Sequence, residues 1–484
     1  MNLVSEILLG AGRRAPTKVA IVTNDARQLS FGDLDRLSGQ LANVLTQRYG
    51  IVSGDRVAVQ WNKVPELLAL HIACLRVGAV YVPLNTGYTD HEVLALLDDA
   101  APSLFVRPTP IAHATRRADF AELEAAARDA STDFDDVPCD ADTPAAILFT
   151  SGTTGRPKGA VLTHGNLAFN CRTLNDVWSF TSSDVLLHAL PLFHTHGLFV
   201  GAYCALSCGA SMIWMESFDA DAVARRLCEA TVFMGVPTHY TRLLATTHLD
   251  RERTASVRLF TSGSAPMLRA THEAFTQRTG HQIVERYGMT ETGMITSNRI
   301  DGALKVGSVG PALPGVDVRI DQGLVGGVEV RGPNVFAGYW NRPELRESEF
   351  TTDGWFKTGD IGSLDDEGFL EIVGRAKDVV ISGGLNVYPK EVELVIDSFP
   401  DVLESAVIGL DDADFGEVVT AVVVARSGAR LEVAALREFA RASLASFKVP
   451  KHFICVEELP RNAMGKVQKA ELRRRLSVTT LIDE

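Results

Sequence analysis

The sequence predicts an α/β fold, because short runs typical of buried strands alternate with stretches typical of amphipathic helices. Strands separated by helices predict a parallel sheet that is covered by helices on both faces. The chain has 484 residues, too many for one ordinary hydrophobic core. Its pattern also restarts near residues 374–378. We therefore expect a large N-terminal domain of α/β sheets with a small β-rich subdomain, and a small C-terminal α+β domain.

The first hundred residues show the alternation most clearly. Ser30 can cap a helix over residues 30–46, in which leucines and valines fall on one face. Pro65 begins a second helix, which Gly78 stops. The remaining predicted elements are strands at 56–61, 80–84 and 104–106 and a helix at 91–99. Residues 111–142 lose the pattern and predict a surface helix and a connection.

Two glycine- and serine-rich loops follow predicted strands in the middle of the chain. One follows a strand at 145–149, and the other, residues 262–266, follows a strand at 258–261. Ligands of parallel α/β sheets gather beyond the carboxyl ends of strands, so both loops could face one crevice. Further predicted elements are strands at 184–187 and 232–236, a helix at 222–229 and a β-rich segment at 302–332.

The C-terminal segment carries its own set of elements. A strand ends at Ile381 before a Ser-Gly-Gly turn at 382–384, and Pro389 begins a helix. Strands at 404–410 and 418–425 and a helix at 434–444 follow. We expect two domains, residues 1–375 and 376–484, of which the second has the size of a small α+β domain.

Composition limits the partners and the compartment. Lys+Arg total 47 and Asp+Glu total 60, and the net charge of -13 argues against nucleic acid as the main partner. The seven cysteines are scattered without a CxxC pair, which is typical of reduced thiols and predicts a cytoplasmic location. The start does not resemble a secretory signal. Residues 185–215 lack Asp, Glu, Lys and Arg, but three histidines and a proline favour a buried soluble segment over a membrane span. The oligomeric state stays open.

The loop at 150–159, Thr-Ser-Gly-Thr-Thr-Gly-Arg-Pro-Lys-Gly, has the composition of an anion site. It combines three glycines, four hydroxyl residues and two cations. Glycine lets the backbone approach a ligand closely, and successive N–H groups and hydroxyls bind anions. Lys158 adds a mobile charge for phosphate oxygens. No Walker pattern is present, so the loop by itself predicts a polyphosphate site and no particular reaction.

Four more motifs accompany this loop. They are Tyr-Gly-Met-Thr-Glu at 287–291, Thr-Gly-Asp at 358–360, Gly-Arg-Ala-Lys-Asp at 374–378 and Pro-Arg-Asn-Ala-Met-Gly-Lys at 460–466. Each alone is compatible with a solvated charge or a turn. Together, in this order and spread, they resemble the adenylate-forming superfamily of acyl-CoA synthetases, peptide-synthetase adenylation domains and luciferases. The resemblance covers nearly the whole chain and implies a large N-terminal domain of stacked α/β sheets and a small mobile C-terminal domain.

The resemblance implies an ATP site that is spread over several motifs. The β- and γ-phosphates would be held by Thr150, Ser151, Gly152, Thr153, Thr154, Gly155 and Lys158. The adenine would be bordered by Ser264, Ala265, Pro266, Tyr287 and Gly288, and the ribose hydroxyls would be bound by Asp360 and Arg375. The loop at 150–159 would therefore hold the leaving group rather than the acid.

The same resemblance implies the catalytic groups and the second substrate. Thr290 would contact the α-phosphate and the acid, and Glu291 would help to hold Mg²⁺, a hard cation suited to carboxylate oxygens. Lys466 would bridge the acid carboxylate and the α-phosphate. Rotation about a hinge at Lys377 would withdraw Lys466 and bring the turn Ser382-Gly383-Gly384 towards the pantetheine arm of coenzyme A. The expected cofactors and co-substrates are ATP, Mg²⁺ and coenzyme A.

Cationic and polar residues in the predicted acid pocket favour a second carboxylate on the substrate. Arg286 directly precedes Tyr287, and neighbouring segments contribute His194, His196 and Arg242. A cation in a small closed pocket suits a charge-assisted contact with a carboxylate, whereas a fatty-acid site would be apolar throughout. The expected partners are thus small molecules, without nucleic acid or membrane.

The runs around these residues are similar to malonyl-CoA synthetases. They include His-Thr-His-Gly-Leu-Phe at 194–199 and Glu-Arg-Tyr-Gly-Met-Thr-Glu-Thr at 285–292. In that group the arginine before the adenine-stacking tyrosine recognises the distal carboxylate, and it matches Arg286. Thr195 and Met294 match positions that flank the α-substituent. The resemblance implies ATP-dependent ligation of malonate, or of methylmalonate, to coenzyme A with release of AMP and pyrophosphate.

Several alternatives stay open on the sequence. Arg286 could pair structurally with Glu285 or Glu291. The enzyme could ligate another small or aromatic acid, or load a carrier protein in trans, although the sequence shows no carrier domain. A non-catalytic nucleotide sensor is disfavoured, because Lys158, Glu291 and Lys466 are intact.

Overall fold

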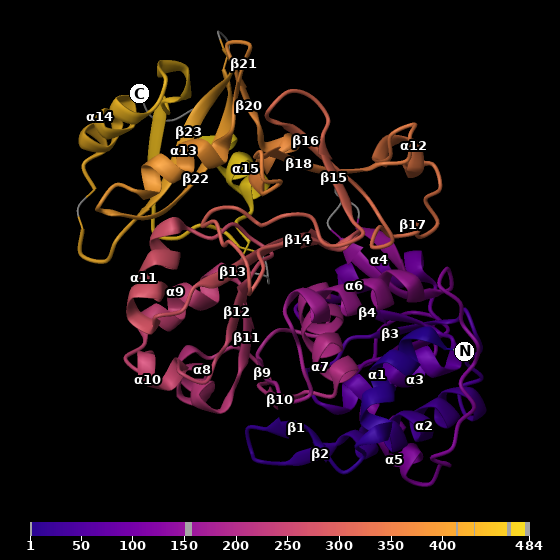
Figure 1. Ribbon diagram of the computed structural model, residues 1–484. Coiled ribbons are helices and arrows are strands. Elements are labelled where there is room, and N and C mark those ends of the chain that lie inside the picture. The colour runs from indigo at the N-terminus through magenta and orange to yellow at the C-terminus, as the bar shows by residue number, and fades with distance from the viewer. Residues whose placement is uncertain (1, 151–156, 413–414, 430, 462–465, 480–484) are drawn as a thin grey trace. The chain divides into compact units, whose positions relative to one another are not determined.

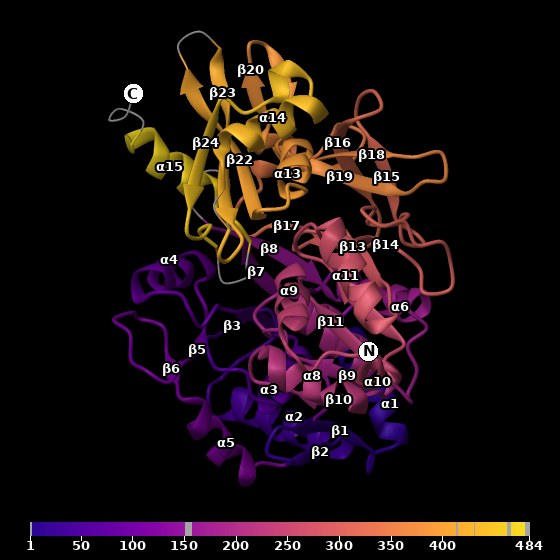
Figure 2. The same cartoon turned by 90° about the vertical axis from the view of Figure 1, so that its left-hand side faces the viewer.

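The computed structural model describes residues 2–150, 157–412, 415–429, 431–461 and 466–479, which form two compact units (Figures 1 and 2). The first unit comprises Met1–Met267, Thr271–Val318 and Val330–Phe356. The second comprises Leu268–Ala270, Arg319–Glu329 and Lys357–Glu484. Lys377 lies in the short 3₁₀ turn η3 (Ala376–Asp378) of the second unit. The domain boundary after residue 375 and the hinge at Lys377 stay predictions.

One sheet of the first unit has eight strands in the order β14-β13-β12-β11-β9-β10-β1-β2. The strands are β1 (Val19–Thr23), β2 (Gln28–Ser30), β9 (Val185–His188), β10 (Ser211–Trp214), β11 (Val232–Gly235), β12 (Leu259–Ser262), β13 (Ile283–Met289) and β14 (Gly293–Ser297). Neighbours from β1 to β13 pair in parallel, and β2 and β14 pair antiparallel at the two edges. Tyr240, Phe260 and Phe275 belong to the core between this sheet and helices α8, α9 and α11. Those helices span Ala220–Arg226, Pro237–Ala245 and Arg269–Thr279.

A second sheet in the same unit has seven strands in the order β17-β8-β7-β4-β3-β5-β6. The strands are β3 (Arg56–Val59), β4 (Val80–Pro83), β5 (Leu104–Val106), β6 (Arg117–Ala118), β7 (Pro144–Thr150), β8 (Lys158–Thr163) and β17 (Gly338–Tyr339). The other helices of this unit are α1 (Leu3–Arg14), α2 (Phe31–Gln47), α3 (Glu66–Val77), α4 (Asp90–Ala100), α5 (Phe120–Arg128), α6 (His164–Val177), α7 (Tyr203–Cys208), α10 (Arg251–Thr254) and α12 (Leu345–Glu349). Two short segments complete it, the π-helical η1 (His196–Ala202) and the 3₁₀ turn η2 (Leu227–Glu229).

Local signals explain where several helices begin and end. Ser30 and Asp33 form a reciprocal capping box at the start of α2, as the sequence predicts. Gly78 ends α3 in the left-handed conformation, with φ of 76°. Every residue of α3 is buried, which agrees with a helix that is apolar on most sides. Residues 185–215 form β9, η1, α7 and β10, which are mostly buried, so the prediction of an interior segment is confirmed. None of the described helices is long and apolar enough to cross a membrane.

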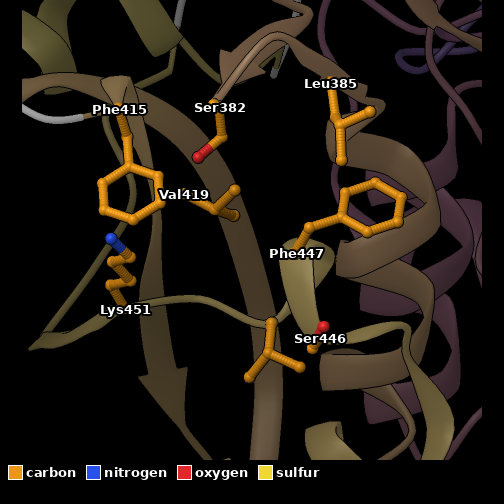
Figure 3. Close-up of a pocket in the computed structure, with 9 residues that line it drawn as sticks. Ser382, Leu385, Phe415, Val419, Ser446, Phe447 and Lys451 are labelled. Atoms are coloured by element: carbon orange, nitrogen blue, oxygen red, sulfur yellow. The ribbon is translucent and has the colours of Figure 1, made fainter.

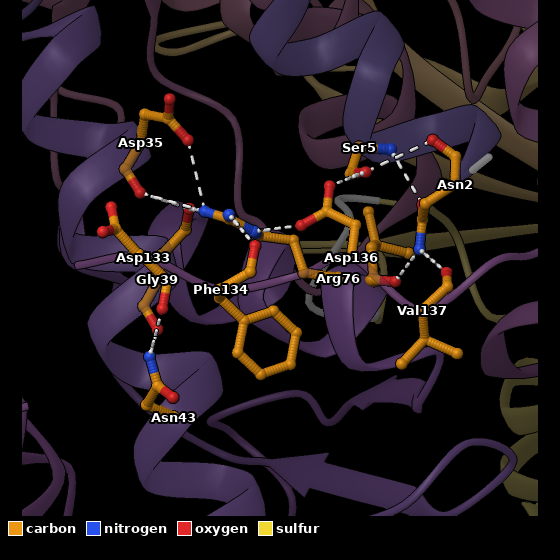
Figure 4. Close-up of polar contacts among 12 residues, drawn as sticks. Asn2, Ser5, Asp35, Gly39, Asn43, Arg76, Asp133, Phe134, Asp136 and Val137 are labelled. Carbon is orange, nitrogen blue, oxygen red and sulfur yellow. Dashed lines mark hydrogen bonds and ion pairs between the residues drawn. The ribbon is translucent and has the colours of Figure 1, made fainter. Parts of the chain in front are cut away.

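Polar side chains anchor the weakly patterned stretch at 111–142 (Figure 4). The guanidinium of Arg76, buried at the end of α3, donates to Asp136 at 2.6 Å and to the Phe134 carbonyl at 3.0 Å. Asn2 donates to the Val137 carbonyl at 3.1 Å. These contacts satisfy backbone carbonyls of a connection that has little apolar periodicity of its own.

Two smaller sheets lie largely in the second unit. One has the order β15-β16-β18-β19, with strands β15 (Asp317–Ile320), β16 (Gly326–Arg331), β18 (Phe356–Leu364) and β19 (Leu370–Arg375). The other has the order β21-β20-β23-β22, with β24 paired to β23. Its strands are β20 (Val380–Ser382), β21 (Leu385–Val387), β22 (Val402–Asp412), β23 (Gly416–Ala425) and β24 (His452–Val456). The helices are α13 (Pro389–Asp397), α14 (Val433–Ser443), α15 (Lys469–Thr479) and the 3₁₀ turn η4 (Ser446–Lys448).

The five-stranded sheet is covered on both faces. Val407 and Val419 pack in one core with α13 and α14, whereas Ile408 and Val422 pack in another with Leu472 of α15. The neighbouring residues of β22 thus point to opposite cores, as the two-residue period of a strand requires. The predicted α/β fold, with a large N-terminal part and a small C-terminal α+β part, is confirmed.

Candidate active site

At the carboxyl edge of the eight-stranded sheet, strand β12 ends beside strand β13, which continues to Met289. Ser262 of β12 pairs with Glu285 of β13, so Arg286 and Tyr287 lie beside the loop that follows Ser262. Ser264 in that loop has a positive φ of 71°, which turns the chain sharply. The loop at 262–266, which is predicted to border adenine, and Arg286, which is predicted to bind the acid, therefore lie side by side at this edge of the sheet.

The guanidinium of Arg286 is buried at this edge, and no described residue is an anionic partner of it. The residue is 3% exposed, and its Nε and Nη2 atoms have no hydrogen-bond partner among the described residues. Burial lowers the pKa of Arg286 to about 10, so the group is still charged at neutral pH. An unpaired buried charge costs several kcal/mol, a penalty that an anion bound beside it offsets.

The carboxylates that could have neutralised Arg286 are engaged elsewhere. Glu285 accepts a hydrogen bond from the backbone of Gly307 at 3.1 Å. Glu291 accepts one from the Tyr339 hydroxyl at 2.9 Å. Within the described part of the chain neither carboxylate is a partner of Arg286 Nε or Nη2, so the structural pair that the sequence left open is not seen.

The segment His194-Thr195-His196 places further unpartnered polar groups close to Arg286. His196 is 3% exposed, and neither ring nitrogen has a partner among the described residues. Burial, and then the charge of Arg286, holds the pKa of His196 well below its usual value, so this ring is neutral. His194 Nε2 and Thr195 Oγ1 are also buried without described partners, and burial lowers the pKa of His194 to about 4. Buried polar atoms rarely lack partners, so the cluster is suited to a polar ligand.

Met294 and Arg242 complete the predicted acid pocket but lie in different surroundings. Met294 in β14 is buried, and its carbonyl accepts from Asn170 at 3.3 Å. Arg242 is exposed on α9. Burial lowers the pKa of His239 to about 3, and the nearby charge of Arg242 adds to this effect. No hydrogen bond or ion pair joins Arg242 to Arg286 among the described residues, and the place of Arg242 in the acid pocket stays a prediction.

Thr150, Lys158 and Glu291 converge next to the predicted phosphate loop. The buried carboxylate of Glu291 accepts from the Tyr339 hydroxyl at 2.9 Å and from Thr150 Oγ1 at 3.3 Å. The Nζ atom of Lys158 pairs with Glu349 at 2.9 Å and lies 5.0 Å from the centre of the Tyr339 ring. Tyr339 is a residue that no sequence motif indicated. The loop residues Ser151, Gly152, Thr153, Thr154 and Gly155 lie outside the described residues.

The residues predicted to border the nucleotide are only partly covered. Ser264, Ala265, Tyr287, Gly288 and Thr290 are half-buried, and Pro266 is exposed. Gly288 also has a packing explanation, because a Cβ there would lie 2.0 Å from the Gly293 carbonyl oxygen. The turn between β13 and β14 thus requires glycine whether or not a nucleotide is bound.

In the second unit, the predicted ribose ligands and the predicted catalytic lysine lie near one another. Asp360 and Arg375 are paired across β18 and β19, with 2.7 Å between carboxylate and guanidinium. Lys466 is an exposed residue. Desolvation, and then the positive charges of Arg375 and Lys377, lower the pKa of its ammonium, whereas the negative charges of Asp360 and Asp378 raise it. An ammonium among mixed charges is suited to donate hydrogen bonds to phosphate oxygens.

The predicted coenzyme A turn lines a pocket of about 320 Å³ in the second unit (Figure 3). Ser382 is buried, and Gly383 and Gly384 have φ of 58° and 78°, which only glycine adopts readily. Phe415 and Phe447 are partly exposed on its wall, and Lys451 lies over the Phe415 ring. Sequence motifs missed these last three residues, since an exposed aromatic residue has no local signature.

Comparison with known proteins identifies the family of this chain. Residues 10–340 match the AMP-binding enzyme family, and residues 391–466 match the AMP-binding enzyme C-terminal domain. A malonate–CoA ligase of Arabidopsis thaliana is 36% identical over 509 residues, which cover 94% of this chain and 84% of that protein. An indoleacetate–CoA ligase of Aromatoleum aromaticum is 36% identical over 504 residues, which cover 97% of each protein.

A solved structure is also similar to this chain over nearly its whole length. The crystal structure of ATP-bound MatB from Rhodopseudomonas palustris is 47% identical to this chain, with a TM-score of 0.92 over 99% of both chains. The first family match alone spans more than half of the sequence. The chain therefore belongs to the AMP-binding, adenylate-forming enzymes, and within them to the acyl-CoA ligases.

Proposed function

We propose that the protein ligates malonate to coenzyme A through a malonyl-adenylate, with AMP and pyrophosphate as the other products. The observation that carries this proposal is the buried guanidinium of Arg286, which has no anionic partner among the described residues. A monocarboxylic acid leaves that charge uncompensated, whereas the distal carboxylate of malonate neutralises it through a charge-assisted contact. The neutral ring of His196 can donate a further hydrogen bond to the same carboxylate.

In the first half-reaction, a carboxylate oxygen of malonate attacks the α-phosphorus of ATP, and pyrophosphate leaves. Thr290 and Lys466 would stabilise the negative charge that gathers on the α-phosphate oxygens. Lys158 and the loop before it would hold the pyrophosphate. The buried carboxylate of Glu291 fits Mg²⁺, which takes one or two carboxylates besides phosphate oxygens and would neutralise phosphate charge.

In the second half-reaction, the thiol of coenzyme A attacks the acyl carbon of the adenylate. A C–S bond forms, AMP leaves with the electrons of the C–O bond, and the thiol proton passes to solvent. Asp360 and Arg375 would keep the ribose in place, and the turn at 382–384 would contact the pantetheine arm. Rotation about Lys377 would exchange the groups needed for the two steps.

Methylmalonate is included in the proposal as a second substrate. It differs from malonate by one methyl group, which would lie between Thr195 and Met294. The buried thioether of Met294 can adapt its shape to a small substituent. A methylene or methyl group in an apolar subsite is worth only about 1–3 kcal/mol, so both acids are expected to react.

The second candidate is a ligase for an aromatic acid, because an indoleacetate–CoA ligase matches this chain as well as a malonate–CoA ligase does. An aromatic acid has one carboxylate, which the reaction consumes, and it offers no anion to Arg286. A carrier-protein thiol in place of coenzyme A is a variant of the same chemistry, which the second half-reaction alone would distinguish.

The test is a panel of malonate, methylmalonate, succinate, acetate and benzoate, scored by acid-dependent ATP–pyrophosphate exchange and by thioester formation. We expect malonate to give the highest kcat/KM. Arg286→Ala should lower kcat/KM for malonate about 100-fold, the order of effect for truncating one partner of a buried charge pair, and should hardly change acetate. Arg225→Ala on the exposed side of α8 is the matched control. Unchanged malonate kinetics in Arg286→Ala would overturn the proposal.

A further inference from the structure

Lys63, which belongs to no motif described above, is buried in the first unit with a full set of acceptors. The residue is 9% exposed. Its Nζ atom lies 2.8 Å from the carbonyl oxygen of His188, 2.6 Å from that of Met215 and 2.8 Å from Nδ1 of His188. It also lies 4.5 Å from the centre of the Trp214 ring. Burial lowers the pKa of Lys63 well below its usual value, and the charge of Glu216 raises it. In its ammonium form the group has three N–H donors, each of which has an acceptor here, and the ring face adds a cation–π contact.

The ring of His188, which contacts Lys63 on one side, contacts the backbone of Gly197 on the other. Its Nε2 lies 2.8 Å from the Gly197 carbonyl oxygen, which can only accept, so Nε2 carries the proton and Nδ1 accepts from Lys63. Burial lowers the pKa of His188 to about 3, so the ring is neutral and keeps this tautomer. Trp214 stacks on the ring at 5.1 Å and 18°, and a Cβ on Gly201 would lie 3.2 Å from Nε2. The ring therefore has little freedom to shift.

The backbone that His188 holds is the π-helical segment η1, which begins at His196. π-Helical turns are rare and often occur at functional sites. No side chain caps the start of η1, and the ring of His196 has no hydrogen-bond partner among the described residues. The placement of that ring therefore depends on the backbone around Gly197. A Cβ on Gly197 would lie 2.0 Å from the Pro191 carbonyl oxygen, so this point of the chain is also tightly packed.

We propose that Lys63 and His188 are positioning residues for the acid pocket, which act through the backbone of Gly197. They hold the segment 194–196 beside Arg286 and thereby set the affinity for the acid rather than for ATP. The pair also links the two large sheets, since Lys63 follows β3 and His188 ends β9. This inference rests on the proposed acid pocket at Arg286 and adds residues that touch no substrate themselves.

The test compares variants of Lys63 and His188 in ATP–pyrophosphate exchange. Lys63→Met keeps the apolar stem but loses the donors, and His188→Phe keeps a ring but loses both contacts. We expect each to raise KM for malonate about tenfold, the order of effect of a displaced positioning group, with less than twofold change in KM for ATP. His188→Gln should restore the wild-type KM, because its amide can accept from Lys63 and donate to Gly197. The double variant should be no worse than either single one, since both break one chain of contacts.

Arg76→Met is the matched control, because Arg76 is another buried cation of the first unit with carboxylate and carbonyl partners. It should lower Tm without changing KM for malonate. The inference is overturned if Lys63→Met and His188→Phe lower Tm in the same way and leave the malonate KM within twofold of wild type. Should Lys63→Met fail to fold, His188→Phe and its Gln counterpart decide the question.

Failure of the proposed substrate gives a different result. In that case the wild-type protein does not use malonate, and the same KM comparison is made with the acid in the panel that does support exchange. If both variants raise KM for that acid and leave KM for ATP within twofold of wild type, the positioning role is supported. Equal KM values for wild type and both variants overturn it, whatever the acid.

Discussion

The guanidinium carbon of Arg286 lies where a side chain on Gly263 would begin, since a Cβ at that position would be 2.5 Å away. The Nη1 atom of Arg286 would be equally close. The register of β12 and β13 brings the two residues together, because Ser262 pairs with Glu285. Glycine at 263 is therefore a condition for the buried position of the guanidinium, and the acid pocket depends on both residues.

The first prediction is that Gly263→Ala displaces Arg286 and weakens malonate binding. We expect KM for malonate to rise about tenfold or more, the scale of a misplaced binding group. The free energy of unfolding should fall by about 1–3 kcal/mol, as for other overpacked sites. Exchange kinetics and urea unfolding measure the two effects. Gly10→Ala in α1, where a Cβ would meet nothing closer than 3.9 Å, is the control. It should leave KM unchanged and should raise, rather than lower, the free energy of unfolding by up to about 1 kcal/mol, because alanine is favoured over glycine inside a helix.

Residues that act through local sequence could be predicted, and residues that act through distant contacts could not. Ser30 begins α2 and Gly78 ends α3 as expected, because capping depends on a few neighbouring residues. Tyr339 bonds to Glu291 across 48 positions, and Lys63 bonds to His188 across 125. No periodicity or motif connects such pairs, since the fold alone brings them together.

The exposure of Arg242 on α9 has a simple cause. Tyr240 and Leu243 are the buried residues of α9, and a residue next to Leu243 on a helix points about 100° away from it. The sequence indicated Arg242 only as a cation in a segment next to the pocket, so its role there stays a prediction. Arg286, by contrast, lies in a strand whose register with β12 fixes its place at the sheet edge.

The second prediction concerns the pH dependence of stability. His71 is buried and 2.7 Å from the Tyr203 hydroxyl, and burial lowers its pKa to about 3 from 6.5. Because the folded-state pKa is the lower one, the stabilisation is complete above pH 6.5 and is lost as pH falls from 6.5 towards 3. The unfolded chain takes up a proton in that window that the folded protein excludes. Between pH 7 and pH 5 this one group should cost about 2 kcal/mol.

Urea unfolding of wild type and His71→Gln at the two pH values measures this effect. Glutamine can keep a hydrogen bond to Tyr203 but does not titrate, so the variant should lose about 2 kcal/mol less than wild type between pH 7 and pH 5. Equal losses would show that His71 does not contribute to the pH dependence.

The third prediction is that Arg76→Met destabilises the first unit without affecting the reaction. Arg76 donates to Asp136 at 2.6 Å and to Asp35 at 3.2 Å, with its own side chain 5% exposed. Removing one member of a buried ion pair leaves the other uncompensated and costs about 3–5 kcal/mol. Urea unfolding monitors the loss, and kcat/KM for malonate at low temperature checks the site. A loss below about 1 kcal/mol would mean that the pair is solvated in solution.

The fourth prediction separates the two half-reactions through Lys466. Its ammonium should act on the α-phosphate during adenylation and should be withdrawn during thioester formation, so Lys466→Ala should affect one step alone. We expect acid-dependent pyrophosphate exchange to fall about 100- to 1000-fold, the usual effect of losing a charge-stabilising group. Thioester formation from supplied malonyl-adenylate should stay within a few-fold of wild type.

Lys469→Ala is the control for Lys466→Ala, because the Nζ of Lys469 pairs with Glu393 at 2.6 Å in the same unit. It should leave both half-reactions unchanged. Equal loss of both steps in Lys466→Ala would contradict the movement of the lysine between steps, since one fixed position would then serve both. Loss of thioester formation alone would instead assign Lys466 to coenzyme A, whose phosphates are also suited to an ammonium.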